Sequence, residues 1–91
     1  MQMVRFWSIS GKYLGSYSNN YFYGATNEIL GEIRGDMVIK NGKLIGNINT
    51  LEYDYIVQGG NIKRNGILIA TKDTRANELE TKIFFTYILE K

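Results

Sequence analysis

The chain has 91 residues, the length of one compact domain, and a formal net charge of +2 from 11 Lys and Arg residues against 9 Asp and Glu. Apolar residues make up 44% of the sequence and aromatic residues 13%, which is enough to build a packed core. There is no cysteine and no histidine, so disulfides, thiolate nucleophiles, the usual zinc and iron–sulfur sites and the commonest general base are excluded. We therefore expect a protein that binds without catalysing, not an enzyme, and we expect no metal and no cofactor.

The basic residues are spread along the chain, and Lys63 and Arg64 are the only adjacent pair. Proteins that bind nucleic acid by neutralising phosphates usually carry a clustered basic stripe, so no nucleic-acid partner is expected. No segment approaches the ~18 apolar residues needed to cross a membrane, and residues 1–7 do not resemble a signal peptide. The expected location is the cytoplasm, of a bacterium or of a phage-infected host, without a membrane partner.

A short unit recurs along most of the chain. Its turns are Ser10-Gly11, Thr26-Asn27, Asn41-Gly42 and Asn65-Gly66. Each turn is followed at a constant distance by an aliphatic residue and then a small one, in the pairs Leu14-Gly15, Leu30-Gly31, Ile45-Gly46 and Ile69-Ala70. Each turn is preceded at a constant distance by an apolar or aromatic residue, namely Trp7, Tyr23, Val38 and Ile62. The third interval is longer than the others, which predicts an insertion of roughly one extra strand before the fourth unit.

Each unit is expected to form a β-hairpin, because Asn-Gly pairs accept the positive φ angles of type I′ turns. Further turn signals fall between the units, at 19–20, 35–36, 49–50 and 59–60. The small residue that follows each aliphatic residue would let one backbone approach another, as at a bulge or a crowded axis. The predicted strands lie near 4–9, 13–18, 20–24, 29–34, 37–40, 44–49, 51–57, 60–64 and 67–72.

The pattern changes after residue 72. Ala76, Leu79, Ile83 and Tyr87 recur at three- and four-residue steps, which predicts an amphipathic helix over about 74–89. Asp73 or Thr74 would cap its start, because their side-chain oxygens can accept hydrogen bonds from free amides of the first turn. The alternative is a strand at 82–89, where β-branched and aromatic residues are frequent. The helix would cover one side or end of the sheet and would also bury surface against a second copy of the chain.

The predicted fold is therefore mainly β, with tandem short antiparallel hairpins over about 4–72 followed by one C-terminal helix, in a single domain of residues 1–91. The hairpins would form a small barrel-like meander.

The recurring unit, as it stands in residues 38–48, resembles that of the bacterial four-fold β-flower domains. Those domains are built from tandem short hairpins around a central axis, and the resemblance covers roughly residues 5–72. The chain departs from the family pattern in its third spacing and at Ala70, where glycine would be expected. It also has Ser16, Glu32 and Asn47 where the family has an aromatic residue. The resemblance implies a fold and carries over no activity and no functional residue.

Two patterns that resemble catalytic or phosphate sites have simpler explanations. Glu52 and Asp54 would share one face of a strand, at a separation used by glycoside hydrolases, but no electrophile or water-activating partner accompanies them. We interpret them as the solvated face of an amphipathic strand. The segment from Gly11 to Gly15 lies between two predicted strands and has neither the Walker nor the dinucleotide spacing, so turn chemistry explains it better.

Aromatic residues crowd the first quarter of the chain and form a second group near residue 54. One interpretation places these tyrosines at the edge of the core with their hydroxyls in water. The functional interpretation is a stacking surface for a flat ligand, with a basic residue against an attached phosphate. The candidate ligand-binding residues are Trp7, Tyr21, Tyr23, Arg34, Tyr53, Tyr55, Lys63 and Arg64.

Together these features favour a non-catalytic binding protein, expected to be a homo-oligomer, that holds a small anionic aromatic ligand such as a nucleotide or a nucleotide-derived signal. Small bacteriophage proteins that sequester host nucleotide signals provide an analogy. The alternative is a protein–protein interaction module or inhibitor that docks through a strand edge or the C-terminal helix.

Overall fold

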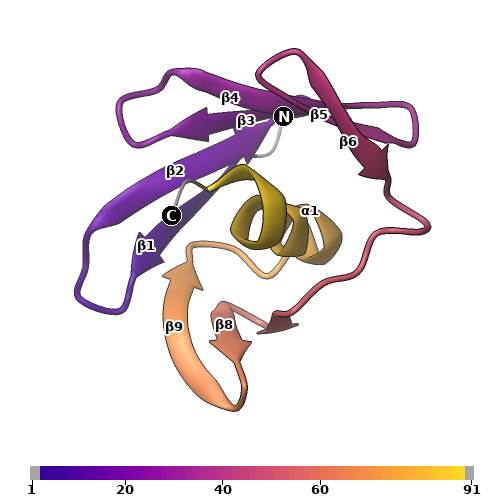
Figure 1. Ribbon diagram of the computed structural model, residues 1–91. Helices are drawn as coiled ribbons and strands as arrows, with labels where there is room; N and C mark the ends of the chain where they lie inside the picture. Colours follow the sequence, from indigo (N-terminus) through magenta and orange to yellow (C-terminus); the bar gives the residue numbers. More distant parts are fainter. Residues whose placement is uncertain (1–2, 90–91) are drawn as a thin grey trace.

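The computed structural model describes residues 3–89, which form nine strands and one C-terminal helical segment (Figure 1). The helical segment consists of α1 (Glu78–Ile83) and a π-helical continuation, η1 (Phe84–Ile88). The strands are β1 (Met3–Ser8), β2 (Tyr13–Ser18), β3 (Tyr21–Gly24), β4 (Ile29–Arg34), β5 (Met37–Lys40), β6 (Lys43–Asn47), β7 (Ile56–Gln58), β8 (Asn61–Arg64) and β9 (Ile67–Lys72).

All nine strands belong to one sheet, in the order β6-β5-β4-β3-β2-β1-β9-β8-β7, and every neighbouring pair is antiparallel. The pairing of β1 with β9 brings the first and last hairpins together, while β6 and β7 form the two edges. Figure 1 shows the sheet curved around the helix, with β3–β6 above it and β8 and β9 below. The predicted fold, a mainly β chain of antiparallel hairpins followed by one helix, is confirmed. The resemblance to the β-flower domains stays a prediction.

The repeat has a structural basis, because the strand register shifts at the same point in all four hairpins. Next to each shift, a fully buried side chain on the first strand pairs with the small residue on the second. The pairs are Phe6 with Gly15, Phe22 with Gly31, Val38 with Gly46 and Ile62 with Ala70. The predicted insertion before the fourth hairpin is also present, as β7.

The alignment of Trp7 and Tyr23 with Val38 and Ile62 is wrong by one residue. The first two turns are longer, since the Ser8 amide donates to the Lys12 carbonyl at 2.8 Å. In the third and fourth hairpins, a two-residue turn joins the paired strands directly. The extra residue moves the side chains of Trp7 and Tyr23 to the outer face of the sheet, the face away from the helix, because adjacent strand residues point to opposite faces.

The two-residue turns adopt the predicted conformation. Asn41 and Gly42 have φ angles of 51° and 79°, and Asn65 and Gly66 have 53° and 78°. Positive φ at both positions is the signature of a type I′ turn, whose twist matches that of the paired strands. The turn residues therefore set the register of these hairpins.

The predicted close approach of backbones occurs at the repeat glycines. A Cβ atom on Gly31 would lie 2.5 Å from the carbonyl oxygen of Ile39, and one on Gly15 would overlap the carbonyl oxygen of Tyr23. At Gly46, by contrast, a Cβ atom would meet only the end of the Leu51 side chain. The first two of these glycines let adjacent hairpins lie against each other.

The segment that links β6 to β7 is largely irregular, so the strand predicted at 51–57 is shorter than expected. Only Ile56–Gln58 is a strand, paired with β8. Within the irregular part, the Tyr53 hydroxyl donates to the carbonyl oxygen of Ile48 at 3.1 Å, and the Tyr87 hydroxyl donates to that of Glu52 at 2.5 Å. These bonds tie the linker to itself and to the helix.

The C-terminal segment is helical, as predicted, and the alternative strand at 82–89 is not formed. The α-helix begins at residue 78 rather than 74, because neither Asp73 nor Thr74 caps it. The carboxylate of Asp73 accepts the Arg5 backbone amide at 2.9 Å, and the Thr74 hydroxyl accepts the amide of Ala76 at 3.1 Å. The residue at the N-cap is Asn77, in the left-handed region with φ 61°.

The helix supplies the centre of the core. The ring of Phe84 stacks on Phe6 at a centroid distance of 4.5 Å, and Phe22 and Phe85 pack around it. The apolar helical side chains Ile83, Phe84, Phe85 and Ile88 are all buried among the strands. The helix therefore covers the inner face of the sheet, as expected, and these side chains are not available to a second copy of the chain.

Replacement of Phe84 by alanine tests the central role of the helix. We expect Phe84→Ala to lower the free energy of unfolding by about 3–5 kcal/mol, because a large cavity would open between the strands and the helix. Urea denaturation followed by circular dichroism measures this change. Leu79→Ala on the same helix is the control, since Leu79 is 37% exposed and should cost below about 1 kcal/mol. Equal effects of the two substitutions would contradict this account of the core.

The close approach at Gly31 is tested by adding a methyl group. Gly31→Ala should destabilise the protein by about 1–3 kcal/mol, because the new Cβ meets a backbone carbonyl that cannot rotate away. Gly46→Ala is the control at the same repeat position, where the flexible Leu51 side chain can move, and should cost less than half as much. Thermal unfolding of the two variants measures both effects, and a larger loss for Gly46→Ala would overturn the argument.

Candidate functional site

The predicted ligand-binding residues do not form one site. The first group lies around β7, β8 and the linker before them and consists of Tyr53, Tyr55, Lys63 and Arg64. Trp7 lies apart from this group, on β1. The remaining members, Tyr21, Tyr23 and Arg34, share the outer face of β3 and β4.

In the first of these groups, the aromatic and basic residues contact each other or the core. Tyr55 is buried and packs against Phe85 at a centroid distance of 5.7 Å. The Arg64 guanidinium lies over the same ring, with its Cζ atom 5.5 Å from the ring centroid. This cation–π contact occupies one face of Tyr55 from within the chain. Lys63 is directed to the outer face, where it pairs with Ile56 and Leu68.

The ring and the hydroxyl of Tyr53 also make contacts within the chain. Its ring makes an edge-on contact with Tyr87 at 6.0 Å, and its hydroxyl donates to the Ile48 carbonyl. Burial raises the pKa of the Tyr53 hydroxyl, with a smaller contribution from the neighbouring Tyr87. Trp7 similarly packs against Tyr13, across the first hairpin, at a centroid distance of 5.7 Å. These rings stabilise the fold.

The third group borders a hollow on the outer face of the sheet. The hollow beside Tyr23 has a volume of about 380 Å³ and is lined by Met3, Ser16, Ser18, Asn19, Tyr23 and Asn27. The antiparallel register of β2 and β3 brings the lining together, because Ser16 pairs with Tyr23 and Ser18 with Tyr21. Ser16 and Ser18 are only 2% and 5% exposed, so they form the floor of the hollow. We call this feature the Tyr23 hollow.

The Tyr23 hollow has an uncharged lining and two arginines near its borders. Arg5 pairs with Ser16 across β1 and β2, and one of its guanidinium nitrogens lies 3.4 Å from the Asp73 carboxylate. Arg34 follows Ile33, whose amide donates to the carbonyl of Asn20 in the β2–β3 turn. The Arg34 guanidinium lies 2.9 Å from the Glu32 carboxylate. This distance is shorter than the 3.4 Å between the Arg5 guanidinium and the Asp73 carboxylate.

Sequence reasoning found Tyr23 but missed the rest of the lining and Arg5. A signal for the two serines was present. Tyr17 separates Ser16 from Ser18, and Phe22 separates Tyr21 from Tyr23, so each pair points to one face. A two-residue turn at Asn19-Asn20 then fixes the register that places both pairs on the same face.

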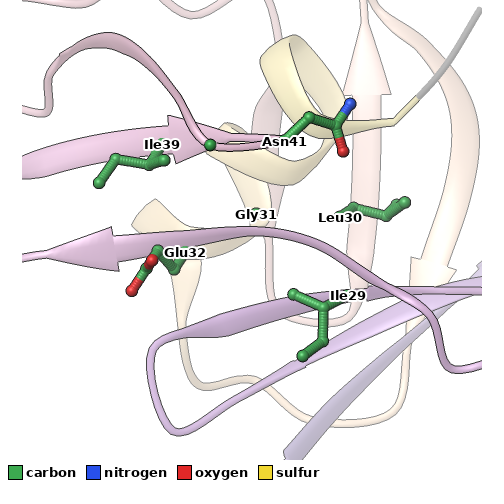
Figure 2. A pocket seen from close by; sticks show the side chains of 7 residues that line it. Ile29, Leu30, Gly31, Glu32, Ile39 and Asn41 are labelled. Atoms are coloured by element: carbon green, nitrogen blue, oxygen red, sulfur yellow. The ribbon is translucent and has the colours of Figure 1, made fainter.

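Two other hollows occur at equivalent places in the repeat, each between the aliphatic residue of one hairpin and the turn of the next. One, of about 170 Å³, lies along β4 and β5 and is shown in Figure 2; it includes Ile29, Glu32 and Ile39. The other, of about 290 Å³, includes Tyr13, Ala25 and the helix-terminal Leu89. In the first of these, the Asn41 amide donates to the Leu30 carbonyl at 3.1 Å, so the next turn is bonded to the residue at the register shift.

The carboxylate pair Glu52 and Asp54 is not aligned by a strand, because residues 51–55 are irregular. Both residues are exposed, in agreement with their interpretation as solvated side chains. Among residues 3–89, no group of three or more carboxylates lies close enough together to hold a metal ion. In that same range, no helix has the length and apolar character that crossing a membrane requires.

A buried lysine marks the junction between β9 and the helix. Lys72 is 7% exposed, and its Nζ atom donates to the Ala76 carbonyl at 2.5 Å. Burial lowers the pKa of its ammonium group, while the nearby Glu78, Glu80 and Asp73 carboxylates act in the opposite direction. The hydrogen bond holds the connection before α1 in place, so we assign Lys72 a structural role.

The pKa of Tyr53 predicts an alkaline transition. Above pH ~10 the unfolded chain loses this proton before the folded chain does, so stability should fall as pH rises towards the raised pKa of the folded state. Tyr53→Phe should flatten this fall, and should cost about 1 kcal/mol at neutral pH because the bond to Ile48 is lost. Urea denaturation at a series of alkaline pH values measures the slope. An unchanged slope in Tyr53→Phe would contradict the assignment.

The chain was also compared with protein-family models, curated proteins and solved structures, and none of the three comparisons found a match.

Proposed function

We propose that this chain is a non-catalytic binding protein that holds a small planar ligand with an anionic group, of the nucleotide class, in the Tyr23 hollow. The observation that carries the proposal is the juxtaposition of an aromatic ring with hydroxyl and amide groups on one hollowed part of the outer face. Of the predicted aromatic residues, Tyr23 is the one that lines this hollow.

The lining suits a nucleobase. The half-buried ring of Tyr23 offers a stacking surface, and stacking of a base on an aromatic side chain contributes about 1–3 kcal/mol. Hydroxyl and amide groups both donate and accept hydrogen bonds, so Ser16, Ser18 and Asn27 match the mixed edge of a base. A neutral heterocycle would enter this uncharged lining without the cost of burying an ionised group.

An anionic group of the ligand would meet Arg5. This residue shares the outer face with Ser16 and Tyr23, and its side chain is about half exposed. Its contact with Asp73 is long at 3.4 Å and exposed, so little stability is lost when the guanidinium turns to a phosphate. A phosphate accepts two parallel hydrogen bonds from an arginine, which makes it a strong competitor for that side chain.

Binding without turnover is supported by the absence of histidine and cysteine from the sequence, because the commonest proton-transfer group and the most reactive nucleophile are missing. A protein of this kind would sequester its ligand. We propose the cytoplasm, of a bacterium or of a phage-infected host, as its location.

The test compares ribonucleoside monophosphates with the nucleosides that lack the phosphate, by isothermal titration calorimetry. Tyr23→Ala should weaken binding of the best monophosphate by about tenfold or more, because the stacking surface is lost. Tyr21→Ala is the matched control, since Tyr21 is on the same strand and face but does not line the hollow. Arg5→Gln should weaken binding of the monophosphate and leave the affinity for the nucleoside unchanged.

Two results would overturn the proposal. One is the absence of binding to every nucleotide and nucleoside tested, together with no ultraviolet-absorbing small molecule released when the purified protein is denatured. The other is a nucleotide that binds the unmodified chain but whose affinity falls as much in the Tyr21→Ala variant as in the Tyr23→Ala variant.

A further inference from the structure

Exposed apolar side chains gather on the outer face of β3–β6. Ile29 is 61% exposed, Leu44 62%, Met37 43% and Tyr21 38%. Ile39 connects three of these residues, because it pairs with Leu44, lies two residues after Met37 on the same face of β5, and lines one hollow with Ile29. Tyr21 lies on the other side of Glu32, which pairs with both Tyr21 and Ile39. We call this surface the outer patch. Scattered apolar residues are normal on a protein surface, but a contiguous group of them marks an interaction site.

The outer patch contains both a hollow and a side chain of a size to fill it. The hollow of Figure 2 lies along β4 and β5, and its lining includes Ile29, Glu32 and Ile39. Leu44 lies on the next strand, β6, as the cross-strand neighbour of Ile39. A volume of about 170 Å³ accommodates one branched aliphatic side chain. A projecting residue beside a matching hollow makes the surface complementary to itself.

The two opposite charges of the outer patch pair with each other within one chain. Glu32 and Arg34 lie side by side on β4, with 2.9 Å between the Glu32 carboxylate and the Arg34 guanidinium. Because these two charges compensate each other, two copies of the patch can approach without net repulsion. A partner of strong single-sign charge would find no such match. The charges therefore permit a second copy of the same chain, and the projecting Leu44 beside the hollow is what selects it.

We propose that the outer patch is the interface of a symmetric homodimer, in which Leu44 of each copy enters the Figure 2 hollow of the other. A two-fold axis relates like surfaces, so one projection and one hollow on the same face suffice to form two equal contacts. With Leu44 on β6 and the hollow along β4 and β5, this axis runs near β5, and Ile39 lies close to its own counterpart. The two sheets pack face to face, while the helices remain buried inside each copy.

The oligomeric state tests the dimer directly. Sedimentation velocity over a range of micromolar concentrations should show a monomer–dimer equilibrium in the unmodified chain. Leu44→Asp should raise the dimer dissociation constant by about a hundredfold, because the new carboxylate would lose its water next to the Glu32 carboxylate that lines the hollow. Ile67→Asp is the matched control, since Ile67 is 65% exposed but begins β9, beyond β1 and β2 from the outer patch. This control should dimerise like the unmodified chain.

A disulfide test follows from the absence of cysteine in the sequence. Ile39→Cys should form a covalent dimer rapidly under mild oxidation, because the two thiols meet near the axis, whereas Ile67→Cys should cross-link slowly. A chain that stays monomeric at all concentrations overturns the proposal. So does a dimer that survives Leu44→Asp, or one in which Ile67→Cys cross-links faster than Ile39→Cys. Neither assay involves a ligand, so these outcomes are separate from those of the nucleotide titrations.

Discussion

The contact on which the rest of the structure depends is the close approach of neighbouring hairpins over a glycine. The carbonyl oxygen of Ile39, in the next hairpin, lies where a side chain on Gly31 would begin. The carbonyl oxygen of Tyr23 lies in the same way against Gly15. On the inner face, these glycines also leave room for the helix, since Phe84 contacts the space beside Gly15 and Ile88 the space beside Gly31. Without side chains at these points, a nine-stranded sheet can curve enough to enclose a helix of this size. The same two glycines therefore allow both the curvature of the sheet and the packing of the helix against its inner face.

Much of this fold follows from local rules, and the errors arise where local rules compete. Asn-Gly pairs fix the third and fourth hairpins, because few other residue pairs tolerate positive φ twice in succession. In the first two hairpins the turns are one residue longer, and no sequence rule distinguished Phe6 from Trp7 as the inward residue. The start of the helix was missed for a related reason, since Asp73 and Thr74 are good capping residues that instead bond to Arg5 and Ala76. Their partners lie on another strand or in a loop, which a local pattern does not reveal.

The candidate site was harder to predict than the fold, because a site depends on which strands are neighbours. Residue type singled out Tyr23, which lines a hollow on the outer face, and its role in stacking stays a prediction. However, it grouped Tyr23 with Tyr55, whose buried ring lies beneath Arg64, directly before the edge strand β7. The serines opposite Tyr23 carry no chemical signature of their own. They line the Tyr23 hollow only through the pairing of β2 with β3, so the order of the strands, and not composition, determines which residues line it.

The central position of the helix has a consequence for the order of events during synthesis. All nine strands precede the helix in the chain, so their inner face has no packing partner until residues 83–88 have been made. The contact between Phe6 and Phe84 joins points near opposite ends of the described chain, and contacts of such long sequence separation form slowly. In the interval the emerging hairpins expose Phe6, Phe22 and Ile62 to solvent and to one another. Until the helix has been made, the growing polypeptide therefore exposes apolar surface and unpaired strand edges, which make a chain prone to aggregate.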